Sequence, residues 1–309
     1  MQQDAGPKLT RQIALMNQKG GVGKTTTTVN LAAAFARKGR RTLLIDLDPQ
    51  GHASLHLGID TAADQPSAYD MLQDPSIDPA SVIRSAVENL DVIAATTDLA
   101  AAEGELASAA DRQQRLTKAL ARINPPGKPV YEFVLLDCPP SLGLLTLNAL
   151  AFAREVIIPM QAHFLALQGV GKLLETVKLV SAAVNPKLKV SGVVLCMHDA
   201  SSTHTREVVA DLDQFFDAQR TADVPWNRAR VYRPPVRRNI KLAECPSFGK
   251  TIFDYAPGAP GAEDYAALGE TMLKEWDMML AKRSSTELAA PAAEKPVVNV
   301  PARGVPAQR

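Results

Sequence analysis

The chain has 309 residues, a length that allows one large α/β domain or two smaller ones. Its 46% hydrophobic and 22% charged residues describe an ordinary globular protein with a sizeable core. The formal net charge of +1 excludes a protein that binds nucleic acid through its overall charge, so any such surface must come from local clustering.

The sequence also excludes a cysteine-based metal or redox protein and a protein with a membrane-spanning helix. The three cysteines (Cys138, Cys196 and Cys245) are far apart and fit no metal or redox motif. The most apolar stretch, residues 142–153, is shorter than the roughly 20 residues that span a bilayer. We therefore expect a soluble, cytoplasmic protein that does not bind membranes.

Strand-like and helix-like segments alternate along the chain. Short apolar runs predict strands at 13–16, 42–45, 90–94, 133–136, 156–158 and 190–196. Apolar residues at helical spacing predict helices at 25–38, 165–183, 203–216 and 263–282, and Gly39 suits a left-handed cap on the first. This alternation predicts a single α/β domain, with a mostly parallel twisted sheet and helices on both faces.

The composition changes at the two ends of this pattern. Residues 1–11 are polar and are expected to form an N-terminal extension. Residues 284–309 carry prolines at regular intervals without helical or strand periodicity, and we expect a disordered tail there. The folded domain is thus expected at 12–283.

A glycine-rich loop follows the first predicted strand. Gly23, Lys24 and Thr25 match the end of the P-loop pattern, although Gln18 stands where that pattern begins with glycine. The backbone N–H groups of such a loop and the positive end of the next helix bind phosphate oxygens. We expect Lys24 to contact the β- and γ-phosphates of ATP, Thr25 to bind Mg²⁺ and Thr26 to contact the α-phosphate.

Four blocks of sequence carry recognisable motifs: NQKGGVGKTTTTVNLA (17–32), LLIDLDPQG (43–51), FVLLDCPPSLG (133–143) and RRNIKLAECPSFGK (237–250). In this order they resemble the ParA/MinD family of partition and positioning ATPases, and most of all its short ParA/Soj-like members. The resemblance implies a deviant Walker A P-loop that includes Lys19, Gly20, Gly21 and Val22. It further implies that Lys19 reaches the phosphates of a second subunit in an ATP-dependent homodimer.

Three aspartates end predicted strands or follow them directly, at the edge where ligands bind in open α/β sheets. We expect Asp48 to orient the water that attacks the γ-phosphate. We expect Asp46 to support the Mg²⁺ shell, and Asp137 to hold Mg²⁺ directly or through water as a Walker B aspartate. A partner protein is expected to accelerate hydrolysis.

A basic segment lies between residues 228 and 250, with seven basic residues and one acidic residue, Glu244. Such clustering is typical of a phosphate-backbone site, although a solvated basic loop is the alternative. The resemblance implies ATP-dependent, sequence-nonspecific contacts with double-stranded DNA here, and a nucleotide-contacting loop at Pro246. The candidate DNA contacts are Arg206, Arg233, Arg237, Arg238, Lys241 and Lys250.

The resemblance has one departure. Family members often carry an arginine where this chain has Ser201, and Arg206 either replaces it or is an ordinary helix charge. The five histidines lie in no metal spacing and are expected to be structural or surface residues.

The resemblance favours a DNA-segregation ATPase of the nucleoid that works with a ParB-like partner. A positioning ATPase for a non-DNA cargo is an alternative that the residues do not separate from it. A MinD-like membrane-bound regulator is less favoured, because the predicted helix at 263–282 carries many acidic residues and leads into a polar tail.

Overall fold

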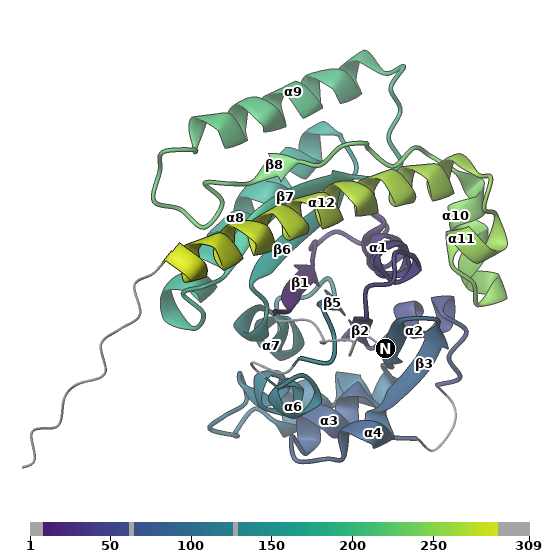
Figure 1. Ribbon diagram of the computed structural model, residues 1–309, viewed down its shortest axis with the longest axis vertical. Coiled ribbons are helices and arrows are strands. Elements are labelled where there is room, and N and C mark those ends of the chain that lie inside the picture. The colour runs from purple at the N-terminus through teal and green to yellow at the C-terminus, as the bar shows by residue number, and fades with distance from the viewer. Residues whose placement is uncertain (1–8, 62–64, 126–128, 290–309) are drawn as a thin grey trace, which may run out of the picture. The chain divides into compact units, whose positions relative to one another are not determined.

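The computed structural model describes residues 9–61, 65–125 and 129–289. These residues form one eight-stranded sheet (Figure 1), in the order β3-β4-β2-β5-β1-β6-β7-β8. The strands are β1 (Arg11–Leu15), β2 (Thr42–Asp46), β3 (Ile83–Val87), β4 (Leu90–Ile93), β5 (Phe133–Asp137), β6 (Glu155–Met160), β7 (Lys189–Leu195) and β8 (Arg230–Val231).

All neighbouring strands in this sheet run parallel except β3 and β4, which are antiparallel. The predicted mostly parallel α/β fold is confirmed. The two edge strands, β3 and β8, were not predicted. Every residue of β3 is at least partly exposed, and β8 has two residues, so neither gives the buried apolar run from which the other strands were predicted.

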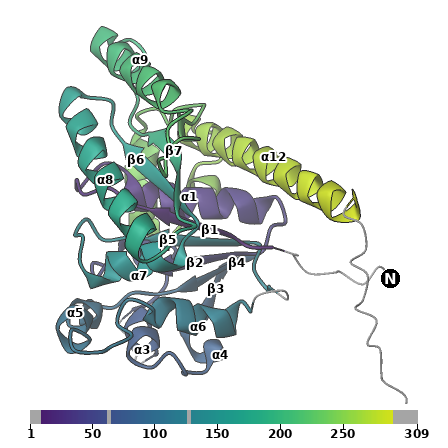
Figure 2. The same cartoon turned by 90° about the vertical axis from the view of Figure 1, so that its left-hand side faces the viewer.

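Helices cover both faces of the sheet (Figure 2). On one face α1 packs against β2 and β5, where the rings of Phe35 and Phe133 lie 4.5 Å apart. On the other face α3, α6, α7 and α8 close the main core over β1, β2, β5 and β6. The helices are α1 (Lys24–Arg37), α2 (His52–His56), α3 (Ala68–Gln73), α4 (Pro79–Val82), α5 (Ala102–Glu105), α6 (Arg115–Ile123), α7 (Leu144–Phe152), α8 (Phe164–Ala183), α9 (Thr203–Ala218), α10 (Ile240–Glu244), α11 (Ile252–Tyr255) and α12 (Pro260–Ala289), with 3₁₀ turns η1 (Thr97–Ala100) and η2 (Cys245–Phe248).

The register of the central strands determines where the site lies. Leu15 of β1 and Asp46 of β2 both pair with Asp137 of β5. The loop after β1 and the carboxylates at the ends of β2 and β5 therefore meet at one edge of the sheet, the carboxyl edge that binds ligands in open α/β folds.

The ends of the fold differ from the expected bounds. Arg11 belongs to β1 and not to an N-terminal extension, because its guanidinium is buried against Glu155 of β6 through two hydrogen bonds of 2.8 Å. Helix α12 continues to Ala289, past the expected start of a tail at 284. The rest of the expected tail, 290–309, lies outside the described residues.

The chain divides into two compact units, residues 1–271 and 272–309, within α12. The domain boundary at 283/284 therefore stays a prediction. In the described part of the chain, no helix has the length and apolar content needed to cross a membrane.

Candidate functional site

The loop between β1 and α1 has the backbone conformation of a phosphate-binding loop. Gly21 and Gly23 have positive φ angles of 71° and 89°, a region that side chains with a Cβ rarely occupy. A Cβ at Gly23 would also lie 3.2 Å from Cβ of Cys196. Helix α1 begins at Lys24, so its free N–H groups and positive dipole end face this loop.

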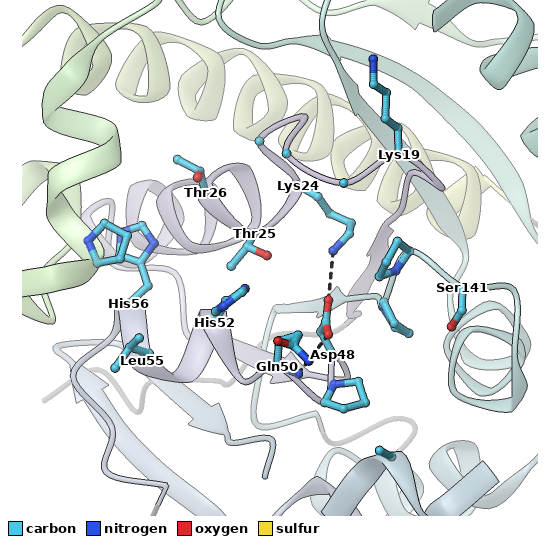
Figure 3. Close-up of a pocket in the computed structure, with 18 residues that line it drawn as sticks. Lys19, Lys24, Thr25, Thr26, Asp48, Gln50, His52, Leu55, His56 and Ser141 are labelled. Atoms are coloured by element: carbon cyan, nitrogen blue, oxygen red, sulfur yellow. Dashed lines mark hydrogen bonds and ion pairs between the residues drawn. The ribbon is translucent and has the colours of Figure 1, made fainter. Parts of the chain in front are cut away.

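Lys24 lies between two carboxylates, and Figure 3 shows the one that belongs to Asp48. Its ammonium nitrogen is 3.7 Å from Oδ2 of Asp48 and 3.9 Å from Oδ1 of Asp137, and its side chain is 9% exposed. Burial opposes the charge on Lys24, but the charges of Asp137 and Asp48 outweigh it and raise the pKa of Lys24. The ammonium is therefore a fixed positive charge at the phosphate loop.

Asp137 connects the first turn of α1 to the end of β5. The hydroxyl of Thr25 donates to Oδ2 of Asp137 at 2.7 Å, and the hydroxyl of Thr28 donates to Oδ1 at 2.9 Å. Complete burial raises the pKa of Asp137, against the opposing effects of Lys24 and the two hydroxyls. A hydroxyl backed by a carboxylate fits a Mg²⁺ ion bound to phosphate oxygens, a hard cation that prefers oxygen ligands.

Asp46 lies at the end of β2, and its expected support of the Mg²⁺ shell stays a prediction. It is fully buried, and one carboxylate oxygen accepts bonds from the backbone N–H and hydroxyl of Ser54 at 2.9 and 2.8 Å. The other oxygen accepts from the backbone N–H of Asp48 at 3.2 Å. Burial and the nearby charge of Asp137 raise the pKa of Asp46 to about 7. Asp46 thus fixes the loop that carries Asp48, and it does not line the pocket described below.

A pocket of about 770 Å³ opens beside this cluster. The predicted site residues that line it are Lys19, Gly20, Gly21, Gly23, Lys24, Thr25, Thr26, Asp48 and Pro246. Of the other predicted residues, Val22 is buried and contributes only its backbone to the loop, and Asp46 and Asp137 lie behind the wall.

The pocket also has lining residues that were not predicted as site residues, including Gln50, His52, Leu55, His56 and Ser141 (Figure 3). Four of these lie on or just before α2, which packs against η2, the turn that carries Pro246. The block DPQG at 48–51 was the only sequence signal near this wall.

His56 is the least expected member of this wall. It is 1% exposed, and among the described residues neither ring nitrogen has a hydrogen-bond partner of good geometry. Burial lowers the pKa of His56 to about 4, so the ring is neutral near neutral pH.

Lys19 is exposed at the mouth of the pocket. Its backbone N–H donates to Oδ1 of Asn17 at 3.0 Å, and its ammonium lies 2.9 Å from Nε2 of His163. In Figure 3 the ammonium points away from Lys24 and Asp48. The two lysines of the motif therefore face different surroundings.

Three of the six candidate DNA contacts are already paired within the protein. Arg233 binds Asp213 at 2.8 Å, Arg237 binds Glu263 and Asp264, and Lys241 binds Glu244 at 2.8 Å. The acidic partners of Arg233 and Arg237 come from α9 and α12, so counting charges within 228–250 missed them.

Arg237 is a structural residue as well. Its backbone N–H and its guanidinium both contact the buried carboxylate of Asp264, at 2.8 and 2.7 Å. Arg238 and Lys250 are exposed and form no ion pair in the described part of the chain. Arg206 on α9 donates to the hydroxyl of Thr203 at 3.0 Å.

The chain is similar in sequence and in structure to known proteins. The family described as an AAA domain matches residues 10–190. The sporulation initiation inhibitor protein Soj of Bacillus subtilis is 44% identical over 84% of this chain and 96% of its own length. The chromosome partitioning protein ParA of Myxococcus xanthus is 42% identical over 85% of this chain and 88% of its own.

The solved structure of cobyrinic acid a,c-diamide synthase from Mycobacterium smegmatis with bound ATP analogue and magnesium is 34% identical to this chain. Its TM-score is 0.71, and the match covers 87% of this chain and 96% of that one. The septum site-determining protein MinD of Pyrococcus horikoshii with Mg-ADP shares the fold, with a TM-score of 0.63 at 23% identity, over 85% of this chain and 96% of its own.

The phosphate loop, the buried lysine and the hydroxyl–carboxylate pair form an Mg-ATP site, and the similarity to Soj and ParA extends over most of the chain. This protein belongs to the ParA/Soj family of P-loop ATPases.

Proposed function

We propose that this protein is a DNA-segregation ATPase whose ATP-bound form is a sandwich dimer that binds DNA without sequence specificity. The observation that carries the proposal is the separation of the two signature lysines. Lys24 is buried between Asp48 and Asp137, whereas Lys19 is exposed and contacts none of them. Lys24 can contact the phosphates of the nucleotide bound to its own subunit. Lys19 then remains available to contact the phosphates of the nucleotide bound to a second subunit.

The residues around Lys24 support a division of roles in hydrolysis. Lys24 holds the β- and γ-phosphates, and Thr25 provides the hydroxyl ligand for Mg²⁺ with Asp137 behind it. Bound Mg²⁺ supplies positive charge that stabilises the phosphoryl oxygens during transfer. Asp48, 7% exposed on the pocket wall, orients the attacking water. The water oxygen bonds to the γ-phosphorus and one of its protons passes to a phosphoryl oxygen. The bond to the bridging oxygen breaks, and ADP and dihydrogen phosphate leave.

The DNA contacts are proposed for the basic residues that remain unpaired. Arg238 and Lys250 are exposed without an ion pair among the described residues, and Arg206 retains an exposed guanidinium on α9. In a dimer each of these is present twice, which strengthens binding without new contacts. We place the protein on the nucleoid, with a ParB-like or cargo-bound partner that stimulates hydrolysis and thereby releases DNA.

The test is an electrophoretic shift of random duplex DNA with ATP, with ADP and without nucleotide. A shift that requires ATP is expected, because only the triphosphate joins the two subunits. Equal shifts in all three conditions would contradict the proposed coupling. Affinity capture with the ATP-bound protein then identifies the partner, and a non-DNA cargo adaptor in place of a ParB-like protein would favour a positioning role.

A further inference from the structure

The contact between Lys19 and His163 restricts the chemical state of the histidine. An ammonium group can only donate hydrogen bonds, so Nε2 of His163, 2.9 Å away, must be the acceptor. The imidazole that accepts is neutral and carries its proton on Nδ1. In Figure 3 the side chain of Lys19 extends away from Lys24 and Asp48.

The surroundings of His163 favour this neutral state. His163 is the N-cap residue of α8, where the helix dipole disfavours a positive charge. The titratable groups that face it among the described residues are Lys19 from the phosphate loop and His204 from α9. Partial burial, then Lys19 and His204, lower the pKa of His163. The acceptor is therefore present at neutral pH and is lost when acid protonates the ring.

We propose that His163 is a positioning residue that holds Lys19 outside the phosphate pocket until a second, nucleotide-bound copy of the chain competes for the ammonium. The inference rests on the proposed ATP-dependent dimer and adds a restraint on its assembly. The phosphates of the second copy offer a stronger, charged acceptor, so pairing breaks the contact with His163. Removing the acceptor, or protonating it, makes Lys19 available and lets the dimer form at lower nucleotide concentration.

The size of the restraint follows from its exposure. A hydrogen bond or ion pair between exposed side chains contributes between a few tenths and about 1 kcal/mol, which corresponds to about a two- to fivefold change in an equilibrium constant. Lys19 is exposed and His163 is half-buried. We therefore expect His163→Ala to lower the nucleotide concentration at half-maximal dimerisation by about two- to fivefold.

The first experiment tests the contact itself. The imidazole pKa of His163 is measured by NMR in the full-length protein and in Lys19→Met, with the resonance assigned from His163→Gln. Removal of the lysine charge should raise this pKa. The same value in both proteins would overturn the proposal, whatever the oligomeric state.

The second experiment tests the effect on assembly by sedimentation with Mg²⁺ and a slowly hydrolysed ATP analogue. His163→Ala should dimerise more readily than the wild-type chain, whereas His163→Gln, which keeps an acceptor, should resemble it. Lowering the pH from neutral to well below the ordinary imidazole pKa of about 6.5 should favour the wild-type dimer but not that of His163→Gln. A weaker dimer in His163→Ala, or equal pH dependence in both, would overturn the restraint. If the wild-type chain stays monomeric, the proposed function is contradicted, and the NMR experiment alone decides the contact.

Discussion

The hydroxyl of Thr25 donates to the carboxylate of Asp137 across 2.7 Å, linking the first turn of α1 to the end of β5. The two residues are 112 positions apart in sequence, and only the parallel register of β1 and β5 brings them together. The carboxylate fixes the orientation of the hydroxyl that we assign to Mg²⁺. Partners of this kind are important for metal affinity.

Replacement of Thr25 should therefore separate metal binding from nucleotide binding. Thr25→Val removes the hydroxyl at nearly constant volume, and we expect the Mg²⁺-dependent part of ATP affinity to fall by at least about tenfold. Thr25→Ser keeps the hydroxyl and should retain most of the Mg²⁺-dependent affinity. Calorimetric titration with ATP, in the presence and absence of Mg²⁺, measures this affinity in each variant. Similar Mg²⁺ dependence in Thr25→Val and Thr25→Ser would contradict the assignment of the Thr25 hydroxyl to Mg²⁺.

Lys24 is expected to be essential for nucleotide binding. Lys24→Ala removes the buried ammonium and leaves Asp48 and Asp137 as uncompensated negative charges that repel phosphate. Loss of one partner from a buried charged cluster weakens binding by about 100-fold or more. Lys38→Ala, at an exposed lysine that pairs with Glu270, is the matched control and should bind normally. Fluorescent-nucleotide titration compares the two, and equal affinities would refute the role of Lys24.

Asp48 should be required for turnover more than for binding. Asp48→Ala removes the carboxylate that we assign to the attacking water, and general-base or positioning groups of this kind contribute about 10²–10⁴-fold to rate. Phosphate release under saturating ATP should fall by that order, while ATP affinity stays within a few-fold. The variant should then accumulate as an ATP-bound dimer. Unchanged phosphate release would remove Asp48 from the mechanism.

The parts of this fold that were predicted from sequence are those with local causes. The buried strands give apolar runs, and Gly39 ends α1 with a φ of 76°, as its position indicated. The phosphate loop was identified because its glycines, lysines and threonines are contiguous. The tail was expected from residue 284 because the sequence there has regularly spaced prolines and no periodicity. Glutamate, leucine and alanine favour helix, however, and α12 continues through them.

What could not be predicted depends on contacts between distant segments. The wall at His52, Leu55 and His56 becomes part of the pocket only because α2 packs against η2. Two arginines of the basic segment, Arg233 and Arg237, form ion pairs with Asp213 and Asp264. These acidic residues lie on other helices, so the sequence of the segment alone did not show that its charge is partly neutralised. Asp46 and Asp48 are two residues apart, yet Asp46 is buried and accepts hydrogen bonds from Ser54, whereas Asp48 lines the pocket.

The paired and unpaired arginines allow a sharper test of DNA binding. Arg238→Glu with Lys250→Glu reverses two exposed charges without breaking an ion pair, whereas Arg237→Glu would also disrupt the contact with Asp264. We expect the double variant to lose most ATP-dependent binding to duplex DNA. Its log–log dependence on salt should be shallower by roughly 0.9 for each lost phosphate contact.

The charge-matched control is Lys187→Glu with Lys189→Glu. These exposed lysines lie just before β7 and at its first residue, at the opposite edge of the sheet from the nucleotide pocket. The control should bind DNA with nearly wild-type affinity and salt dependence. Equal losses in the two double variants would show that net charge, and not a defined surface, drives the binding.

His56 should make the stability of the fold depend on pH. Its folded-state pKa of about 4 lies below the ordinary value of 6.5, so the unfolded chain binds a proton more readily between these values. The free energy of unfolding should therefore decrease as the pH falls from about 6.5 towards 4, by about 3 kcal/mol in total from this residue. Asp46, with a folded pKa raised to about 7, acts in the opposite direction over the same range, so the wild-type curve alone does not isolate His56.

A comparison of two variants on the same helix isolates the contribution of His56. His56→Asn removes the buried imidazole, and His52→Asn removes an exposed one on α2. Urea unfolding near pH 7 and near pH 4 should show that His56→Asn loses about 3 kcal/mol less than the wild-type protein on acidification, whereas His52→Asn behaves as wild type. Asp46 is present in all three proteins, so its effect cancels in the differences. If acid destabilises His56→Asn as much as wild type, His56 is not the neutral, buried group in the pocket wall that its surroundings require.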